Sequence, residues 1–223
     1  WGFQYALTCS RPRLDAFAAS EGSSGRVAFI VIVTDGAPTP MHSGTPTDAA
    51  ARAALAALRQ LVSSYSVRLV VRLCTDEESA VSFWNEADSE LELPLDVLDD
   101  FEGEAKAVHA HGNGWLCYSP ALHLLRESGT LIGLLDLLDE RTLSPGESAV
   151  LAGLLLECDT LPDWKHDRAE FAAAVTARAA AAGQTLDGRR RRMAPLVDAR
   201  ALLRAVHGPG LGERIAYIAG PLL

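Results

Sequence analysis

The sequence predicts an α/β protein in which a parallel sheet, covered by helices, precedes an α-helical carboxyl-terminal extension. Two short apolar runs predict the sheet, at residues 27–33 (Val-Ala-Phe-Ile-Val-Ile-Val) and 67–74 (Val-Arg-Leu-Val-Val-Arg-Leu-Cys). The first has no polar alternation, which is typical of a strand buried on both faces. An alanine-rich helical segment joins the two runs, and a β–α–β crossover of this kind makes its strands parallel. We therefore expect a Rossmann-like sheet.

The other elements of the amino-terminal half follow in order along the chain. Residues 2–19 predict a helix that Pro12 interrupts. After a loop rich in proline, threonine and glycine, Thr47 or Asp48 can cap the crossover helix, which extends to about Ser63. Three further helices are expected at residues 77–88, 95–110 and 119–128.

Beyond Gly129 the pattern of strands disappears. Ser144, Pro145 and Glu147 form an amino-terminal helix signature. Residues 184–192 are polar, include four consecutive arginines at 189–192 and predict a loop. The expected helices of this part are 131–141, 144–158, 165–182 and 198–207.

These elements divide the chain into an α/β domain at residues 1–129 and a helical extension at 130–223. We expect the extension to pack on the sheet domain through four leucines, at positions 131, 134, 135 and 138. Four cysteines, at positions 9, 74, 117 and 158, show no Cys-x-x-Cys spacing, which indicates reduced thiols in an intracellular, cytoplasmic protein.

The composition narrows the classes of partner. The chain of 223 residues has a formal charge of −9. This charge argues against a general binder of nucleic acid or anionic membranes and favours cations or basic partners. No apolar run approaches the roughly 18–20 residues that span a bilayer, so no membrane segment is expected.

Each predicted strand ends on a threonine and an aspartate. Thr34 and Asp35 follow the first strand, and Asp76 follows the second. The carboxyl ends of parallel strands share the edge where open α/β sheets bind ligands. The sequence therefore makes Asp35 a candidate metal ligand, with Thr34, Thr39 and Asp76 as weaker contributors.

The segment Val-Ile-Val-Thr-Asp-Gly at 31–36 resembles the third metal-site motif of von Willebrand factor A (vWA) domains. In that family the aspartate helps to hold a divalent cation in a metal-ion-dependent adhesion site. Val-Arg-Leu-Cys-Thr-Asp at 71–76, Trp-Leu-Cys-Tyr at 115–118 and Arg-Met-Ala-Pro-Leu-Val-Asp at 192–198 are similar to a group of largely uncharacterised vWA proteins of fungi and protists. The likeness spans about residues 27–205. It implies a vWA-like fold and a protein-binding module that uses Mg²⁺ or another divalent cation.

The chain departs from the family pattern in one respect. The family's site needs Asp-x-Ser-x-Ser after its first strand and a threonine from a second loop, and this chain has no Asp-x-Ser-x-Ser. We expect that segment upstream of Trp1, which would make the vWA-like domain incomplete at its amino end. Thr8 could supply the threonine, although it falls within the predicted first helix. Because Mg²⁺ requires nearly octahedral oxygen coordination, we expect weak or absent binding by this chain.

Other clusters have simpler explanations. Residues 76–104 carry twelve acidic residues without lysine or arginine, but the spacing of a calcium loop is absent, which favours solvated helix faces and leaves a basic partner open. His109, His111, Cys117 and His123 could be drawn as a zinc site, although a His-x-His pair diverges on a helix. Cys74 and Cys117 are more simply buried apolar residues than nucleophiles.

Two more features allow more than one interpretation. Arg189–Arg192 can be a nuclear-import or phosphate-binding patch, or a solvated loop. Trp115 becomes a binding residue only if it is exposed.

The function predicted first is a protein–protein interaction module of the vWA type, without enzymatic activity. The chain has no P-loop, Gly-x-Ser-x-Gly or His-Glu-x-x-His pattern. The alternatives are a metal-dependent hydrolase or phosphotransferase that uses Asp35 and Asp76, and a structural subunit of a larger assembly.

Overall fold

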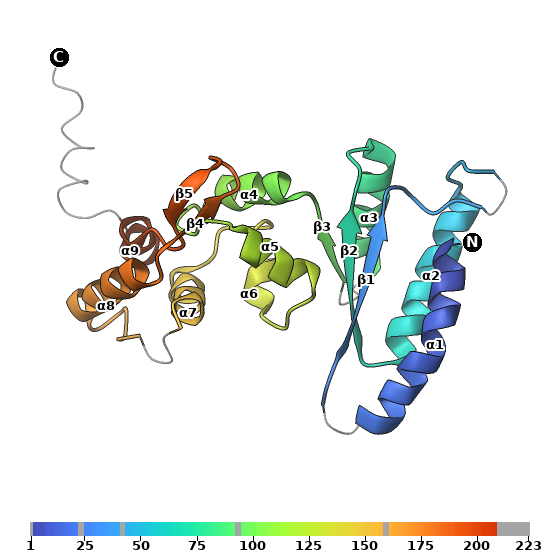
Figure 1. Ribbon diagram of the computed structural model, residues 1–223, viewed down its shortest axis with the longest axis horizontal. Coiled ribbons are helices and arrows are strands. Elements are labelled where there is room, and N and C mark those ends of the chain that lie inside the picture. The colour runs from blue at the N-terminus through green and yellow to red at the C-terminus, as the bar shows by residue number, and fades with distance from the viewer. Residues whose placement is uncertain (1, 22–24, 41–42, 92–94, 158–160, 209–223) are drawn as a thin grey trace, which may run out of the picture. The chain divides into compact units, whose positions relative to one another are not determined.

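A computed structural model describes residues 2–21, 25–40, 43–91, 95–157 and 161–208 (Figure 1). Their contacts group into two compact units. Unit 1 comprises Trp1–Asp100 and Leu124–Leu131, and unit 2 comprises Phe101–His123 and Ile132–Leu223. Residues 101–123 thus group with the carboxyl-terminal helices, whereas the sequence places them in the α/β domain.

Unit 1 contains a three-stranded sheet of β1 (Ala28–Thr34), β2 (Val67–Leu73) and β3 (Leu95–Leu98) in the order β1-β2-β3. Both pairings are parallel, and Ala28 of β1 lies opposite Val67 of β2. The predicted parallel pairing of the two apolar runs is therefore confirmed.

The prediction of one helix over residues 95–110 is wrong at its start, where residues 95–98 form the strand β3. Leu95 and Val97 pack against the helix-side core, whereas Asp96, on the opposite face, bonds Arg126. This alternation has the period of a strand. Helix α4 begins only at Phe101.

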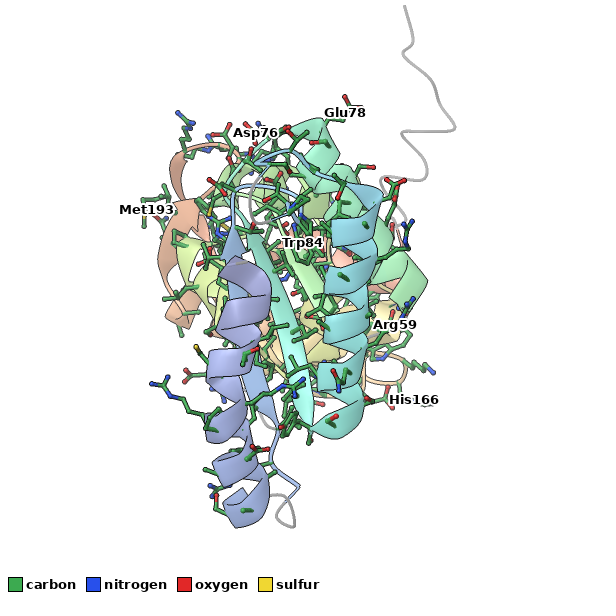
Figure 2. The ribbon with its side chains drawn as sticks, turned by 90° about the vertical axis from the view of Figure 1, so that its right-hand side faces the viewer. Arg59, Asp76, Glu78, Trp84, His166 and Met193 are labelled. Carbon is green, nitrogen blue, oxygen red and sulfur yellow. The ribbon has the colours of Figure 1, made fainter. Side chains whose placement is uncertain are left out.

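Three helices of unit 1 pack against one face of the sheet: α1 (Gly2–Glu21), α2 (Asp48–Ser64) and α3 (Glu78–Leu91). Figure 2 shows α1 and α2 in front of the strands. Leu58, Val71 and Trp84 are among the most buried members of this core. The α2 boundaries agree closely with the prediction, and Thr47 rather than Asp48 is the capping residue, since its hydroxyl accepts the N–H of Ala50.

The opposite face of the sheet is covered only in part. Residues 124–131 pack there: Arg126, 1% exposed, bonds Asp96 at 3.2 Å, and a Cβ at Gly129 would lie 2.1 Å from the ring of Phe29. On β1, however, Val31 is 42% and Val33 68% exposed. The expectation that the first strand is buried on both faces is wrong, because the segment that packs on this second face contacts Phe29 and leaves Val31 and Val33 exposed.

Unit 2 is mainly helical. Its helices are α4 (Phe101–Ala110), the first half of α5 (Pro120–Glu127), α6 (Gly133–Asp136), α7 (Pro145–Leu155), α8 (Arg168–Ala181) and α9 (Ala199–His207). The helix predicted at 131–141 is thus only one turn. Leu135 and Leu138 are fully buried in the core of unit 2 itself, together with Leu151, Phe171 and Leu202. Leu131 is exposed and belongs to unit 1.

A β-hairpin in unit 2 replaces the loop predicted at 184–192. β4 (Gln184–Asp187) pairs antiparallel with β5 (Arg192–Pro195). A carboxylate oxygen of Asp187 accepts the N–H groups of Arg189 and Arg190 at 2.9 and 3.0 Å, which closes the turn. The sequence pattern did not predict these strands because each is only four residues long and contains few apolar residues.

Candidate functional site

The turn Thr34-Asp35-Gly36 ends β1 and is held by three hydrogen bonds. The Thr34 hydroxyl donates to the Gly36 carbonyl at 3.0 Å and accepts the Gly36 N–H at 3.3 Å. The buried Trp84 indole donates from Nε1 to the same carbonyl at 3.2 Å. These bonds leave Asp35 exposed at the end of the strand. Thr34 uses its hydroxyl inside the turn, where it orients Asp35.

A cavity of about 800 Å³ adjoins this turn. The end of β1, the following loop and the beginnings of α2 and α3 line it. Its polar groups are the carboxylates of Asp35 and Glu77 and the hydroxyls of Thr39, Thr47 and Ser79, while alanines and prolines supply most of the remaining wall. The described lining residues include no lysine, arginine or histidine, so their side-chain charge is negative.

The amino terminus of α2 adds a contrasting charge. Thr47, Ala49 and Ala50 line the cavity, and they form the cap and first turn of this 17-residue helix. The unpaired N–H groups of a helix start carry partial positive charge. The cavity can therefore attract a cation at its carboxylates and a negative group at the helix end.

Glu77, rather than Asp76, lines the cavity next to Asp35. The N–H of Cys74 donates to the Thr34 carbonyl at 2.8 Å, which brings the end of β2 beside the turn. Glu77 is then fixed by Thr75, whose hydroxyl accepts the Glu77 N–H, and by Ser79, whose hydroxyl donates to its carboxylate at 2.9 Å. Asp76 is exposed, and Figure 2 shows it near Glu78.

Sequence reasoning missed Glu77 because it was one of twelve acidic residues in a single run. Its distinguishing signal is position: it lies between the end of a strand and the start of α3. The rest of the run is divided between the two units. Asp96 bonds Arg126 in unit 1, whereas Glu102 of unit 2 bonds Lys106 and Arg191, which together lower its pKa. The run is therefore not one acidic face.

The fit of the site to a divalent cation is incomplete. Among the described residues, no group of three or more His, Cys, Asp or Glu side chains is arranged to hold a metal ion. Asp35, Glu77 and nearby hydroxyls supply too few oxygens for a complete Mg²⁺ shell. Thr8 lines a separate cavity beside α1 together with Arg11 and Tyr65. Weak or absent metal binding stays a prediction.

The histidine candidates of unit 2 do not form a metal site. His109 and His111 are exposed, whereas His123 is buried with its Nδ1 3.2 Å from the Tyr118 hydroxyl. Trp115 is 2% exposed and belongs to the core, so it offers no binding surface.

Cys117 is a buried thiol. Burial, followed by the nearby Asp187 carboxylate, raises its pKa to about 11. The thiol is therefore protonated at neutral pH, which opposes a role as nucleophile. Cys9, Cys74 and Cys117 are all free thiols, and Cys158 lies outside the described residues.

No protein-family model, curated protein sequence or solved structure matches this chain. The class defined by the structure is thus that of a mixed α/β protein with a parallel sheet. Within the part of the chain that the structure describes, no helix is long and apolar enough to cross a membrane.

Proposed function

We propose that the protein is a protein–protein interaction module of the vWA type, which binds its partner at the carboxyl edge of the unit 1 sheet. The observation that supports this most is the cavity of about 800 Å³ that adjoins Asp35 at the end of β1. Ligands of open α/β sheets bind at this edge. The resemblance of residues 31–36 to a vWA metal-site motif supports the type of module.

The lining suggests which chemical groups of a partner would be held. Asp35 and Glu77 would attract a basic side chain or a weakly bound divalent cation, and the hydroxyls of Thr39 and Thr47 would supply hydrogen bonds. The start of α2 would favour an acidic group. The described lining has no histidine or cysteine to act as a base or nucleophile, which favours binding over catalysis.

Affinity capture with three forms of the full chain tests the proposal. Wild type, Asp35→Ala and the matched surface variant Asp167→Ala would be used as baits, and every candidate partner would then be purified and titrated. We expect Asp35→Ala to weaken binding of the partner at least about tenfold, roughly 1.4 kcal/mol, while Asp167→Ala binds like wild type. A partner whose affinity is the same for all three forms would show that this edge is not the binding site.

The two carboxylates in one cavity favour a second candidate, a metal-dependent hydrolase or phosphotransferase. Asp35 and Glu77, rather than Asp35 and Asp76, would be its metal ligands. Hydrolysis of p-nitrophenyl phosphate in the presence of Mg²⁺ or Mn²⁺, abolished by Asp35→Asn, would support this candidate. Equal rates for Asp35→Asn and wild type would eliminate it.

The free thiols support a cytoplasmic location. Cys9 and Cys74 are exposed and unpaired in disulfides. Exposed reduced cysteines are typical of a reducing compartment. Fluorescence microscopy of the tagged protein would test this assignment.

A further inference from the structure

The hairpin β4–β5 presents an exposed apolar pair beside its turn. Leu186 and Met193 lie directly opposite each other, and they are 40% and 56% exposed. Opposite residues of an antiparallel pair lie on the same face, so these two side chains form one patch. The next pair, Thr185 and Ala194, faces the other side and is less exposed, because successive residues of a strand alternate. One face of the hairpin is therefore apolar and open.

The turn beside this apolar pair is strongly basic. Residues 184–195 carry four arginines, at 189–192, and one acidic residue, Asp187, a net charge of +3. Asp187 is 7% exposed, and one of its oxygens accepts the two backbone N–H groups that close the turn. Its carboxylate is thus committed to the hairpin itself. The surface of the turn is left with the charge of the arginines.

Two of the four arginines have acidic partners and two do not. Arg190 lies 3.6 Å from the Asp187 carboxylate, and Arg191 pairs with Glu102 of α4. In the part of the chain that the structure describes, no acidic side chain pairs with Arg189 or Arg192. Both lie within three residues of the apolar pair, a backbone distance of at most roughly 10 Å. Uncompensated positive charge and open apolar surface are therefore neighbours on the hairpin.

We propose that this hairpin surface, composed of Leu186, Met193 and Arg189–Arg192, binds an acidic segment of a partner protein. An apolar side chain of that segment would cover Leu186 and Met193, and aspartates or glutamates beside it would pair with Arg189 and Arg192. Arginine binds a carboxylate through two parallel N–H bonds, which gives such pairs a defined direction. The surface belongs to unit 2 and shares no residue with the cavity beside Asp35, so this proposal does not depend on the function proposed above.

The composition of the hairpin favours an acidic protein segment over other anionic partners. Residues 184–195 contain no aromatic side chain on which a nucleic-acid base could stack. An anionic membrane is an extended surface, which the remaining acidic surface of a chain with a formal charge of −9 would also approach. A short acidic segment would contact the hairpin alone. Exposed ion pairs each contribute little, so we expect a dissociation constant on the order of 100 µM.

Fluorescence anisotropy with the full chain tests the surface. The probe is a short labelled peptide with leucines among aspartates and glutamates. Arg189→Glu/Arg192→Glu should weaken its binding at least about tenfold and Met193→Ser about threefold. The matched control is Arg52→Glu/Arg59→Glu, which changes two exposed arginines of α2 and should bind like wild type (Figure 2 labels Arg59).

The peptide provides a second set of controls. Replacing its leucines with serines should weaken binding to wild type about threefold, because the apolar contact is lost. Replacing its acidic residues with lysines should abolish binding to wild type, and this basic peptide should bind Arg189→Glu/Arg192→Glu in its place. Circular dichroism would establish that the variants are folded.

Several results would overturn the proposal. A wild type that does not bind the acidic peptide at about 2 mM, well above the expected constant, would exclude the site. Equal affinities of wild type and Arg189→Glu/Arg192→Glu would show that the peptide binds elsewhere. A serine-substituted peptide that binds as tightly as the original would show that the apolar pair takes no part. Tighter binding of vesicles containing phosphatidylserine, or of a single-stranded oligonucleotide, would assign the arginines to a different class of partner.

Discussion

The position of Asp35 depends on a residue that lies far from it in the sequence but close to it in the fold. The strand pattern and the Asp-Gly step predict its position at the end of β1, because both signals are local. Trp84, 48 residues away, holds the turn from α3 through its bond to the Gly36 carbonyl. The sequence alone does not indicate this contact, since a hydrogen bond across such a separation leaves no local pattern.

The Trp84 indole gives a test at the scale of one residue. Trp84→Phe keeps an aromatic ring but removes the N–H that bonds Gly36. Trp115→Phe is the matched control, because Trp115 is equally buried and no partner for its Nε1 is found among the described residues. We expect Trp84→Phe to lower the free energy of unfolding by about 1 kcal/mol more than the control. Urea denaturation measures both, and equal losses would mean that the bond to Gly36 does not stabilise the turn.

Among the helices and strands, α7 is the one whose start was predicted most completely from the sequence. Ser144 accepts the N–H of Glu147, and the Glu147 carboxylate accepts the N–H of Ser144, so the predicted signature is a complete capping box. Arg141 adds an ion pair to the same carboxylate at 2.7 Å. The pattern was readable because all of its members lie within seven residues of the chain.

This cap predicts a pH dependence. The hydrogen bond from Arg141, followed by those from Ser144, lowers the pKa of Glu147 from 4.5 to about 2. A carboxyl whose folded pKa is depressed stabilises the fold above its unfolded pKa and loses that contribution as the pH falls. We expect the melting temperature of wild type to fall more steeply than that of Glu147→Gln between about pH 4.5 and pH 2.

The Glu147 comparison has a matched control. Glu170→Gln changes a glutamate that also lies in the first turn of a helix, α8. Its melting temperature should follow the wild-type pH profile. Parallel profiles for wild type and Glu147→Gln over the acid range would contradict the role assigned to the cap.

The hairpin β4–β5 gives a third test, based on packing. A Cβ at Gly188 would lie 2.6 Å from the Phe101 ring and 3.0 Å from the Ala105 side chain. We expect Gly188→Ala to cost about 1–3 kcal/mol through overpacking. Gly133→Ala, where a Cβ meets nothing within 4 Å, should leave the stability nearly unchanged. Similar melting temperatures for the two variants would show that the hairpin can shift without cost.

At the scale of the whole molecule, the sequence predicted the parallel sheet and most helices but not the limits of the sheet. Two apolar runs that flank one helix leave few topologies, so the pairing of β1 with β2 followed from general rules. The exposure of Val33 could not be predicted from these rules, because it depends on which segments cover that face of the sheet. The grouping of residues 101–123 with the carboxyl-terminal helices likewise depends on contacts that are long-range in sequence.

The central claim is that the cavity beside Asp35 is where this protein binds ligands. The most direct measurement is the line broadening of backbone amides in two-dimensional ¹⁵N NMR spectra during a titration with Mn²⁺, for wild type and Asp35→Ala. We predict a dissociation constant for Mn²⁺ on the order of millimolar, which corresponds to a binding free energy of roughly 4 kcal/mol. The amide signals of Asp35, Gly36 and Glu77 should broaden first, and this broadening should be lost in Asp35→Ala. Tight binding that survives Asp35→Ala, or broadening centred on residues 96–104, would contradict it.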